Sequence, residues 1–275
     1  MLYRSLSMRN LANLSLCLSC LSLIPAVSYS QAVLLDFGPT TVSTAGTNSP
    51  YHTVNPLFTD SAWNTIGTSD QLNGLIWSDG TSDSALSLDL GATTNSTATV
   101  IGLSNVPSGS NALGSQINTD VYAGDAAGTD AIYTGSSGTR YVGFQLGGLP
   151  AGTYDVYVNA RNTNTNTANL QHVSVGVSSV SGDFDAATLE GTNVLDYEAG
   201  STAATEAWVE SENYLVFTVT VATGDYLNLA VVGDPAGTQT RGFLNSVQIV
   251  PTEAPNEGTI FFISSLNYQS GSLSL

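Results

Sequence analysis

Apolar and polar residues alternate through most of the chain after the first thirty positions. In the segment Thr153–Ala160, Tyr154, Val156 and Val158 fall on one side, and the intervening, mostly polar residues fall on the other. Successive side chains of a β-strand point to opposite faces, so this pattern predicts strands with one buried face. The same reasoning applies to Val33–Phe37, Ala85–Leu90, Ala98–Leu103, Arg140–Leu146, Leu170–Val177, Asn213–Val221, Asp225–Val232 and Gly242–Val250.

Glycine and proline clusters separate these segments, for example at 147–152, 223–225 and 233–237. Such residues favour turns over continued strands. No window of helical length has an apolar stripe, and Ser201–Asn213 is the best candidate for a short helix. We therefore predict an all-β fold, an antiparallel β-sandwich of the jelly-roll type. Two longer polar stretches, Gly38–Gly74 and Asn105–Ile132, are predicted to be ordered loops across one end.

The first thirty residues have the order of a bacterial-type export signal. Arg4 and Arg9 precede an apolar, serine-dotted run from Leu11 to Val27, and small residues follow. We predict a cleaved signal peptide over residues 1–30, a β-sandwich domain over 31–250 and a tail over 251–275. A membrane anchor is the alternative, although the apolar run is shorter than a spanning helix needs. The domain is then secreted or on the cell surface.

Charge narrows the range of partners. The chain has 22 acidic residues and five basic ones, all arginine, and two of the arginines lie in the leader, so the remainder carries 3 − 22 = −19 charges. Such a surface repels nucleic acid and anionic membranes. It does not repel neutral sugars or cations. Both cysteines, Cys17 and Cys20, belong to the leader, so the exported chain has no disulfide and no thiolate metal ligand.

Three segments carry a resemblance to known domains: residues 33–38 (VLLDFG), 149–158 (LPAGTYDVYV) and 242–250 (GFLNSVQIV). Together they resemble the secreted galactose-binding-like sandwich domains of environmental bacteria, many of which belong to proteins with a PEP-CTERM sorting tail. The resemblance implies a jelly roll that recognises extracellular carbohydrate or matrix. Residues 250–255 differ from the Pro-Glu-Pro sorting motif, so the sorting tail is not part of the resemblance.

Sugar binding needs an aromatic face for the apolar side of the ring and planar polar groups for its hydroxyls. Tryptophans and tyrosines are the candidate platforms, and amides, carboxylates and arginines are the candidate partners. The alternative for each aromatic residue is a place in the core, and for each arginine an ion pair. The ligand-binding candidates are Trp63, Trp77, Asp79, Tyr122, Arg140 and Arg241, with Trp208, Tyr133, Asn64, Arg161 and Asn245 as further members.

Calcium is a second possibility, because hard cations bind several carboxylate and carbonyl oxygens. Asp79 and Asp83 flank a Gly-containing turn, and Asp120, Asp125 and Asp130 are evenly spaced in the second long loop. Neither set matches an EF-hand, and the alternative is that these aspartates form turns and aid solubility. The expected cofactor is a structural Ca²⁺ ion or none.

Groups for catalysis are few. The histidines are His52 and His172, and no Gly-x-Ser-x-Gly elbow is present. A carboxylate pair of the glycosidase kind could come from Glu190, Glu198, Glu206, Glu210 and Glu212. The first hypothesis is therefore a secreted or cell-surface, non-catalytic module that binds carbohydrate or extracellular matrix, with or without a stabilising calcium ion. The second is a structural surface or biofilm protein without a small ligand, and the third is a polysaccharide hydrolase or lyase.

Overall fold

A computed structural model of the 275-residue chain describes residues 31–38, 41–42, 46–67, 71–90, 120–124, 126–133, 141–163, 170–181, 192–195, 206–234, 241–252, 267–269 and 272–274. Its strands are β1 Val33–Phe37, β2 Asn64–Ile66, β3 Gln71–Asn73, β4 Ser87–Asp89, β5 Ile132–Tyr133, β6 Val142–Gly147, β7 Gly152–Asn159, β8 Gln171–Ser178, β9 Thr192–Leu195, β10 Leu215–Val221, β11 Tyr226–Gly233, β12 Phe243–Leu244, β13 Ser246–Pro251, β14 Asn267–Gln269 and β15 Ser272–Ser274. The helical segments are α2, Pro50–Val54, and the short 3₁₀ turn Asp120–Tyr122.

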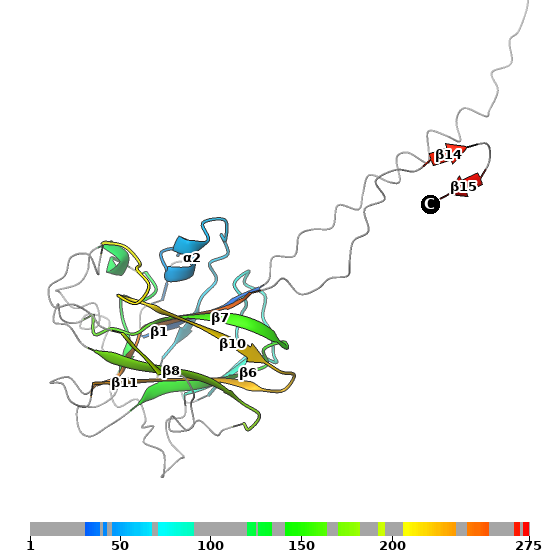
Figure 1. Ribbon diagram of the computed structural model, residues 1–275. Helices are drawn as coiled ribbons and strands as arrows, with labels where there is room; N and C mark the ends of the chain where they lie inside the picture. Colours follow the sequence, from blue (N-terminus) through cyan, green and yellow to red (C-terminus); the bar gives the residue numbers. More distant parts are fainter. Residues whose placement is uncertain are drawn as a thin grey trace, which may run out of the picture.

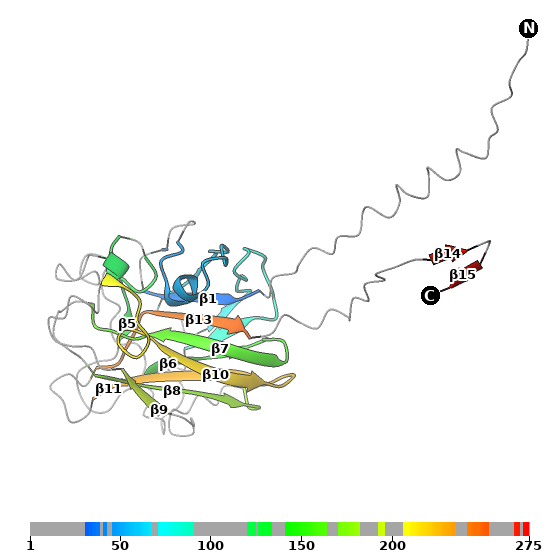
Figure 2. The ribbon, with the colours of Figure 1, turned by 45° about the horizontal axis from the view of Figure 1, so that its top comes forward.

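Two sheets face each other and form a β-sandwich (Figure 1). The five-stranded sheet has the order β10-β7-β13-β1-β2, and the six-stranded sheet has the order β3-β4-β6-β11-β8-β9. Every pairing in them is antiparallel except that of β1 with β2. Figure 2 shows the first and last strands of the sandwich, β1 and β13, lying side by side.

The connections between the sheets are those of a jelly roll. The strands β1, β6, β7, β8, β9, β10, β11 and β13, counted from one to eight along the chain, lie in the orders 6-3-8-1 and 2-7-4-5. The chain thus crosses from one sheet to the other at most steps, and its first and last strands become neighbours. This arrangement of two Greek keys defines the jelly roll, so the predicted fold class is confirmed.

Alternate side chains of both sheets fill the space between the layers. Val156 and Val158 of β7 point inward, as do Phe144 and Leu146 of β6. The rings of Phe37 and Phe144, one from each sheet, stack with centroids 5.6 Å apart. Burial of such side chains contributes about 1.5–3 kcal/mol each, which makes this core the main source of stability.

The outer face of the five-stranded sheet is covered by two smaller apolar clusters. Leu34 and Val250 lie under Phe58, from the segment after α2. Tyr122 and Trp208 pack together on the same side with Tyr214 at the start of β10. The segments that cover this sheet are thus the connections before β2, before β5 and before β10.

Most of the strands predicted from alternation are present. Eight of the nine segments contain a strand, and the ninth, Ala98–Leu103, lies outside the described residues, as do residues 1–30 and Thr259–Ile263. Gly242–Val250 is divided into β12 and β13 at Asn245. The described part of the chain has no helix with the length and hydrophobicity to span a bilayer.

Other predictions need correction. Within the predicted helix Ser201–Asn213, Glu206 is helical and residues 201–205 are not described. Residues 207–213 contain a bend, a bridge and a turn, so this part of the prediction is wrong. The predicted loop Gly38–Gly74 contains α2, β2 and β3. These elements are too short for a period of two to show. The strands β5, β9, β14 and β15 escaped prediction for the same reason.

Candidate functional site

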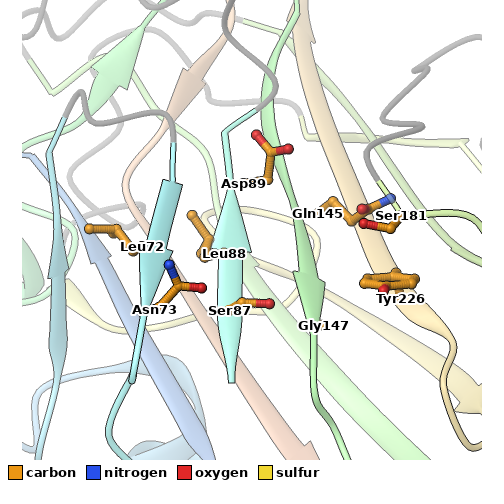
Figure 3. Close-up of a pocket in the computed structure, with 9 residues that line it drawn as sticks. All are labelled: Leu72, Asn73, Ser87, Leu88, Asp89, Gln145, Gly147, Ser181 and Tyr226. Carbon is orange, nitrogen blue, oxygen red and sulfur yellow. The ribbon is translucent and has the colours of Figure 1, made fainter. Parts of the chain in front are cut away.

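A polar groove lies on the outer face of the six-stranded sheet, around β3, β4, β6 and β11 (Figure 3). It follows from the alternation within these strands. In β4, Leu88 points into the core while Ser87 and Asp89 point out. In β6, Phe144 and Leu146 point inward, which turns the intervening residues toward the groove. The residues around the groove are Leu72, Asn73, Ser87, Leu88, Asp89, Gln145, Gly147, Ser181 and Tyr226.

Strand register arranges the outward residues in two rows. Asn73 pairs with Ser87, and Ser87 pairs with Gly147. Continuing the β6–β11 register by one position places Tyr226 beside Gly147. A second row consists of residues that pair in succession across three strands, Asp89, Gln145 and Asn228. Polar and aromatic groups from four strands therefore converge on one surface.

Gly147 allows the aromatic ring of Tyr226 to lie against the sheet. A Cβ atom at position 147 would stand 2.7 Å from Cε1 of Tyr226 and 3.1 Å from Oγ of Ser87. Any other residue would therefore displace the ring. Figure 3 shows the ring beside Gly147, with Ser87 and Asn73 further along the same row.

The second row is held in place by hydrogen bonds. Nε2 of Gln145 donates to Oδ1 of Asn228 at 2.9 Å and to the carbonyl of Val180 at 3.1 Å. Nδ2 of Asn228 donates to Oγ of Ser178 at 3.2 Å. Both amide side chains are buried although they sit on the outer face, because residues 178–180 lie against them. These fixed amides make the floor of the groove rigid.

The groove is small, and the described residues that line it include no basic group. Its volume is ≈ 200 Å³, which is below the roughly 300–1,000 Å³ of pockets that enclose drug-sized ligands. Asp89 is its one charged side chain, and the other polar groups are hydroxyls and amides. The groove therefore suits shallow contact with a neutral, hydroxyl-rich molecule.

Several aromatic residues proposed as ligand platforms lie inside the protein. Trp77 is a member of the main core, and its Nε1 donates to Oδ2 of Asp83 at 3.3 Å. Tyr122 and Trp208 form an edge-to-face pair with centroids 5.5 Å apart, and both are buried. These three rings form part of the packing of the domain.

Trp63 and Asp79, by contrast, line one and the same pocket. This second pocket has a volume of ≈ 380 Å³, and Asp60 and Ser78 are among its other residues. Nε1 of Trp63 donates to the carbonyl of Gly46 at 3.0 Å, so the indole is fixed by its edge. The structure therefore brings these two sequence candidates together.

The remaining polar candidates have structural contacts, apart from Arg140, which lies outside the described residues. The guanidinium of Arg241 lies over the ring of Tyr133, 5.6 Å from its centroid. Arg161 is buried over Tyr122 at 5.2 Å. Asn64 hydrogen-bonds both backbone groups of Ile76. Asn245 donates to the backbone carbonyls of Gly128 and Asp130.

The aspartates proposed as calcium ligands do not form one cluster in the described residues. Asp79 accepts hydrogen bonds from Thr81 and Gln31, and Asp83 accepts one from the amide of Ala85. Burial raises the pKa of Asp79, but the hydrogen bonds from Thr81 and Gln31 together lower it overall. Asp120 is exposed, and Asp125 is not described. No group of three or more His, Cys, Asp or Glu gathers within the described ranges.

The candidate catalytic groups are similarly dispersed. Both ring nitrogens of His52 have partners, Oγ of Ser49 at 2.5 Å and the carbonyl of Asp60 at 2.8 Å. Burial lowers the pKa of this histidine. His172 lies half-buried on β8. Glu206, Glu210 and Glu212 are exposed, while Glu190 and Glu198 lie outside the described part.

The sequence pattern did not single out the groove residues. Gln145 and Asn228 occupy outward positions in otherwise apolar strands, and both are buried amides. That exception to the apolar pattern is the signal that could have identified them. Tyr226 is the first residue of β11, and nothing in the sequence distinguishes it from other aromatic residues in strands.

The fold and the groove thus define an acidic jelly-roll domain with a polar surface on its six-stranded sheet. No family model matches the chain, and no curated protein is significantly similar to it. Three solved structures overlap with parts of it. Protein YxiM of Bacillus subtilis is 13% identical, with a TM-score of 0.32 over 80% of this chain and 40% of that protein.

A ruminal endo-β-1,4-mannanase of glycoside hydrolase family 26 is 10% identical, with a TM-score of 0.27, and the match covers 52% of this chain and 22% of the enzyme. A family 61 carbohydrate-binding module in complex with β-1,4-galactotriose is 18% identical, with a TM-score of 0.24 over 45% of this chain and 72% of the module. The chain spans less than half of the length of the first two proteins. Overlaps of this size assign neither a family nor a function.

Proposed function

We propose that this domain binds a neutral glycan, without catalysis, at the groove on its six-stranded sheet. The observation that carries the proposal is the ring of Tyr226, which lies against Gly147 beside two rows of hydroxyl, amide and carboxylate groups. A sugar ring has an apolar face of C–H groups and a rim of hydroxyls. An aromatic ring next to planar hydrogen-bonding groups matches both parts.

The charge of the groove supports an uncharged ligand. Asp89 and the strongly acidic remainder of the chain would repel uronic acids and sulfated sugars. The carboxylate of Asp89 can accept hydrogen bonds from sugar hydroxyls, and Gln145 and Asn228 are already fixed. A secreted or surface location, which the leader-like residues 1–30 favour, would expose the domain to such glycans.

The affinity is expected to be modest. One stacked ring and a few exposed hydrogen bonds correspond to dissociation constants in the micromolar to millimolar range. The small volume of the groove agrees with contact to one or two sugar units of a polysaccharide.

Affinity electrophoresis in gels that contain neutral or anionic polysaccharides tests the proposal. We expect retardation by at least one neutral polysaccharide and none by polygalacturonate or a sulfated galactan. Tyr226→Ala should weaken binding at least tenfold, whereas Tyr226→Phe should keep most of it, because the stacking face remains.

The variant Trp63→Ala is the matched control, since it removes an aromatic ring from the second pocket. Binding that is lost in this variant and kept in Tyr226→Ala would place the ligand at the second pocket and refute the groove. If both Tyr226→Ala and Trp63→Ala bind the polysaccharide as well as the unmodified chain does, neither the groove nor the second pocket is the binding site. The absence of retardation by every polysaccharide would favour the structural surface role.

A further inference from the structure

The second pocket, lined by Trp63 and Asp79, lies outside the glycan proposal. Residues 41–42, 60–63, 76 and 78–79 line it. Its volume of ≈ 380 Å³ exceeds the ≈ 200 Å³ of the groove. It therefore falls within the range of about 300–1,000 Å³ that is typical of pockets for small ligands. The chemistry of its lining indicates which kind of ligand it fits.

Hydrogen bonds fix the walls of the second pocket relative to each other. The amide of Ala62 donates to the carbonyl of Ser78 at 3.0 Å, and the amide of Ser78 donates to the carbonyl of Ala32 at 2.8 Å. Asn64, at the start of β2, holds Ile76 through both of its backbone groups. Because these bonds tie the two walls together, the pocket is formed before a ligand enters.

One part of the lining is aromatic. The indole of Trp63 is half-buried and packs against the apolar cluster that includes Phe58. Its Nε1 donates to the carbonyl of Gly46 at 3.0 Å, so its one hydrogen-bond donor is already used. Val42 and Ile76 add aliphatic surface to the same lining. The ring therefore offers a ligand its π system and apolar contact, but no hydrogen bond.

The charged side chains among the described lining residues, Asp60 and Asp79, are both acidic. Asp60 accepts a hydrogen bond from Oγ of Ser78 at 3.3 Å, and Asp79 accepts from Nε2 of Gln31 at 2.5 Å and from Oγ1 of Thr81 at 2.6 Å. Burial raises the pKa of Asp79, but its hydrogen bonds together lower it overall, so this carboxylate is ionised at neutral pH. The neutral donors thus occupy acceptor positions of the carboxylates without cancelling their charge.

We propose that the second pocket binds a small organic cation with a quaternary ammonium group. The positive charge of a methylated nitrogen is attracted to the face of an indole ring, and the carboxylates of Asp60 and Asp79 balance it. Such a group donates no conventional hydrogen bond, so it does not need the acceptor positions that are already occupied. A hard metal ion prefers about six to eight oxygen ligands and gains nothing from an indole, so it fits this lining less well. This site uses another pocket and another class of ligand, so it stands independently of the glycan proposal.

Ligand-observed NMR of the full chain with choline chloride, at an ionic strength held constant with NaCl, tests the proposal. We expect saturable binding with a dissociation constant of about 1 mM, because one aromatic face and two solvent-accessible carboxylates give modest affinity. The matched ligand 3,3-dimethylbutan-1-ol has the same shape and no charge, and it should bind about tenfold more weakly. Phosphocholine, which carries the ammonium group on a phosphate as lipid headgroups do, should also bind more weakly, because its phosphate meets two carboxylates. Both comparisons use the unmodified chain, so they do not depend on the folding of any variant.

Two variants and a control locate the site. Trp63→Ala should weaken choline binding about tenfold, and so should the double variant Asp60→Asn, Asp79→Asn, which keeps the shape of both side chains. Glu212→Gln removes an exposed carboxylate that does not line the pocket, and it should leave the dissociation constant unchanged. The absence of saturable binding up to about 20 mM choline, or equal binding of the neutral alcohol or of phosphocholine, would overturn the proposal. So would choline binding that persists unchanged in both Trp63→Ala and the double variant.

Discussion

Asn245 joins three parts of the chain, and replacing it by alanine should destabilise the domain strongly. Its Nδ2 donates to the carbonyls of Gly128 and Asp130, at 3.1 and 2.8 Å, and its Oδ1 accepts from the amide of Arg161 at 2.6 Å. The side chain is fully buried. Asn245 is therefore a structural link between the segment 126–130, the end of β7 and the start of β13.

The magnitude follows from these three contacts. Asn245→Ala leaves one buried N–H and two carbonyls without their partner, and each such group costs about 1–3 kcal/mol. Partial relaxation makes the sum smaller than three full penalties, so we expect a loss of about 3–5 kcal/mol in the free energy of unfolding. For a domain of this size, that corresponds to a fall in Tm of about 6–20 °C.

Urea and thermal unfolding, followed by the fluorescence of the buried Trp77 and Trp208, measure this loss. The matched control is Asn73→Ala, because Asn73 is exposed and its replacement should change stability by less than about 0.5 kcal/mol. A Tm for Asn245→Ala within 2 °C of the unmodified chain would refute the reasoning. It would mean that water replaces the amide without cost.

Two further predictions concern the groove and the buried carboxylates. Gly147→Ala should displace the Tyr226 ring and weaken glycan binding about tenfold, while circular dichroism stays unchanged; unaltered affinity would contradict the placement of the ring. Burial, and then the nearby Asp130, raise the pKa of folded Asp36, so the folded state holds this proton more tightly than the unfolded state. The unmodified chain should therefore lose stability relative to Asp36→Asn as pH rises from the usual aspartate pKa toward the raised pKa. Urea unfolding at a series of pH values measures this difference, and a difference independent of pH would contradict it.

The sequence predicts the sandwich because the core-facing residues of the longer strands recur with a period of two. β7, β8, β10 and β11 each have seven or eight residues, which is long enough for alternation to appear. β2 and β3 have three residues each, and their pairing depends on partners distant in sequence. The local sequence pattern does not reveal such long-range pairings, so these two strands could not be predicted.

The candidate site was harder to predict for a physical reason. The sequence alone does not distinguish a tryptophan or tyrosine in the core from one that contacts a ligand. Trp77 and Tyr122, which were predicted to bind a ligand, are buried in the structure. Which face of β11 carries Tyr226 follows from alternation, but its contact with Gly147 follows from register, and register is set by the whole sheet. Trp63 and Asp79 share a pocket because the loop before β2 folds back on residues 76–79.

The two outer faces of this jelly roll differ in a way that bears on where a ligand can bind. On the five-stranded sheet, Leu34 and Val250 lie under Phe58, and Tyr157 and Val216 pack against a second covering cluster. Covering segments thus occupy that face with apolar contacts, and a buried acidic pair is enclosed beneath one of them. On the six-stranded sheet, the outward positions around Tyr226 are small or polar, so water or a sugar can satisfy them without loss of core packing. A sugar that stacks on this domain through an aromatic ring is therefore expected on the six-stranded face.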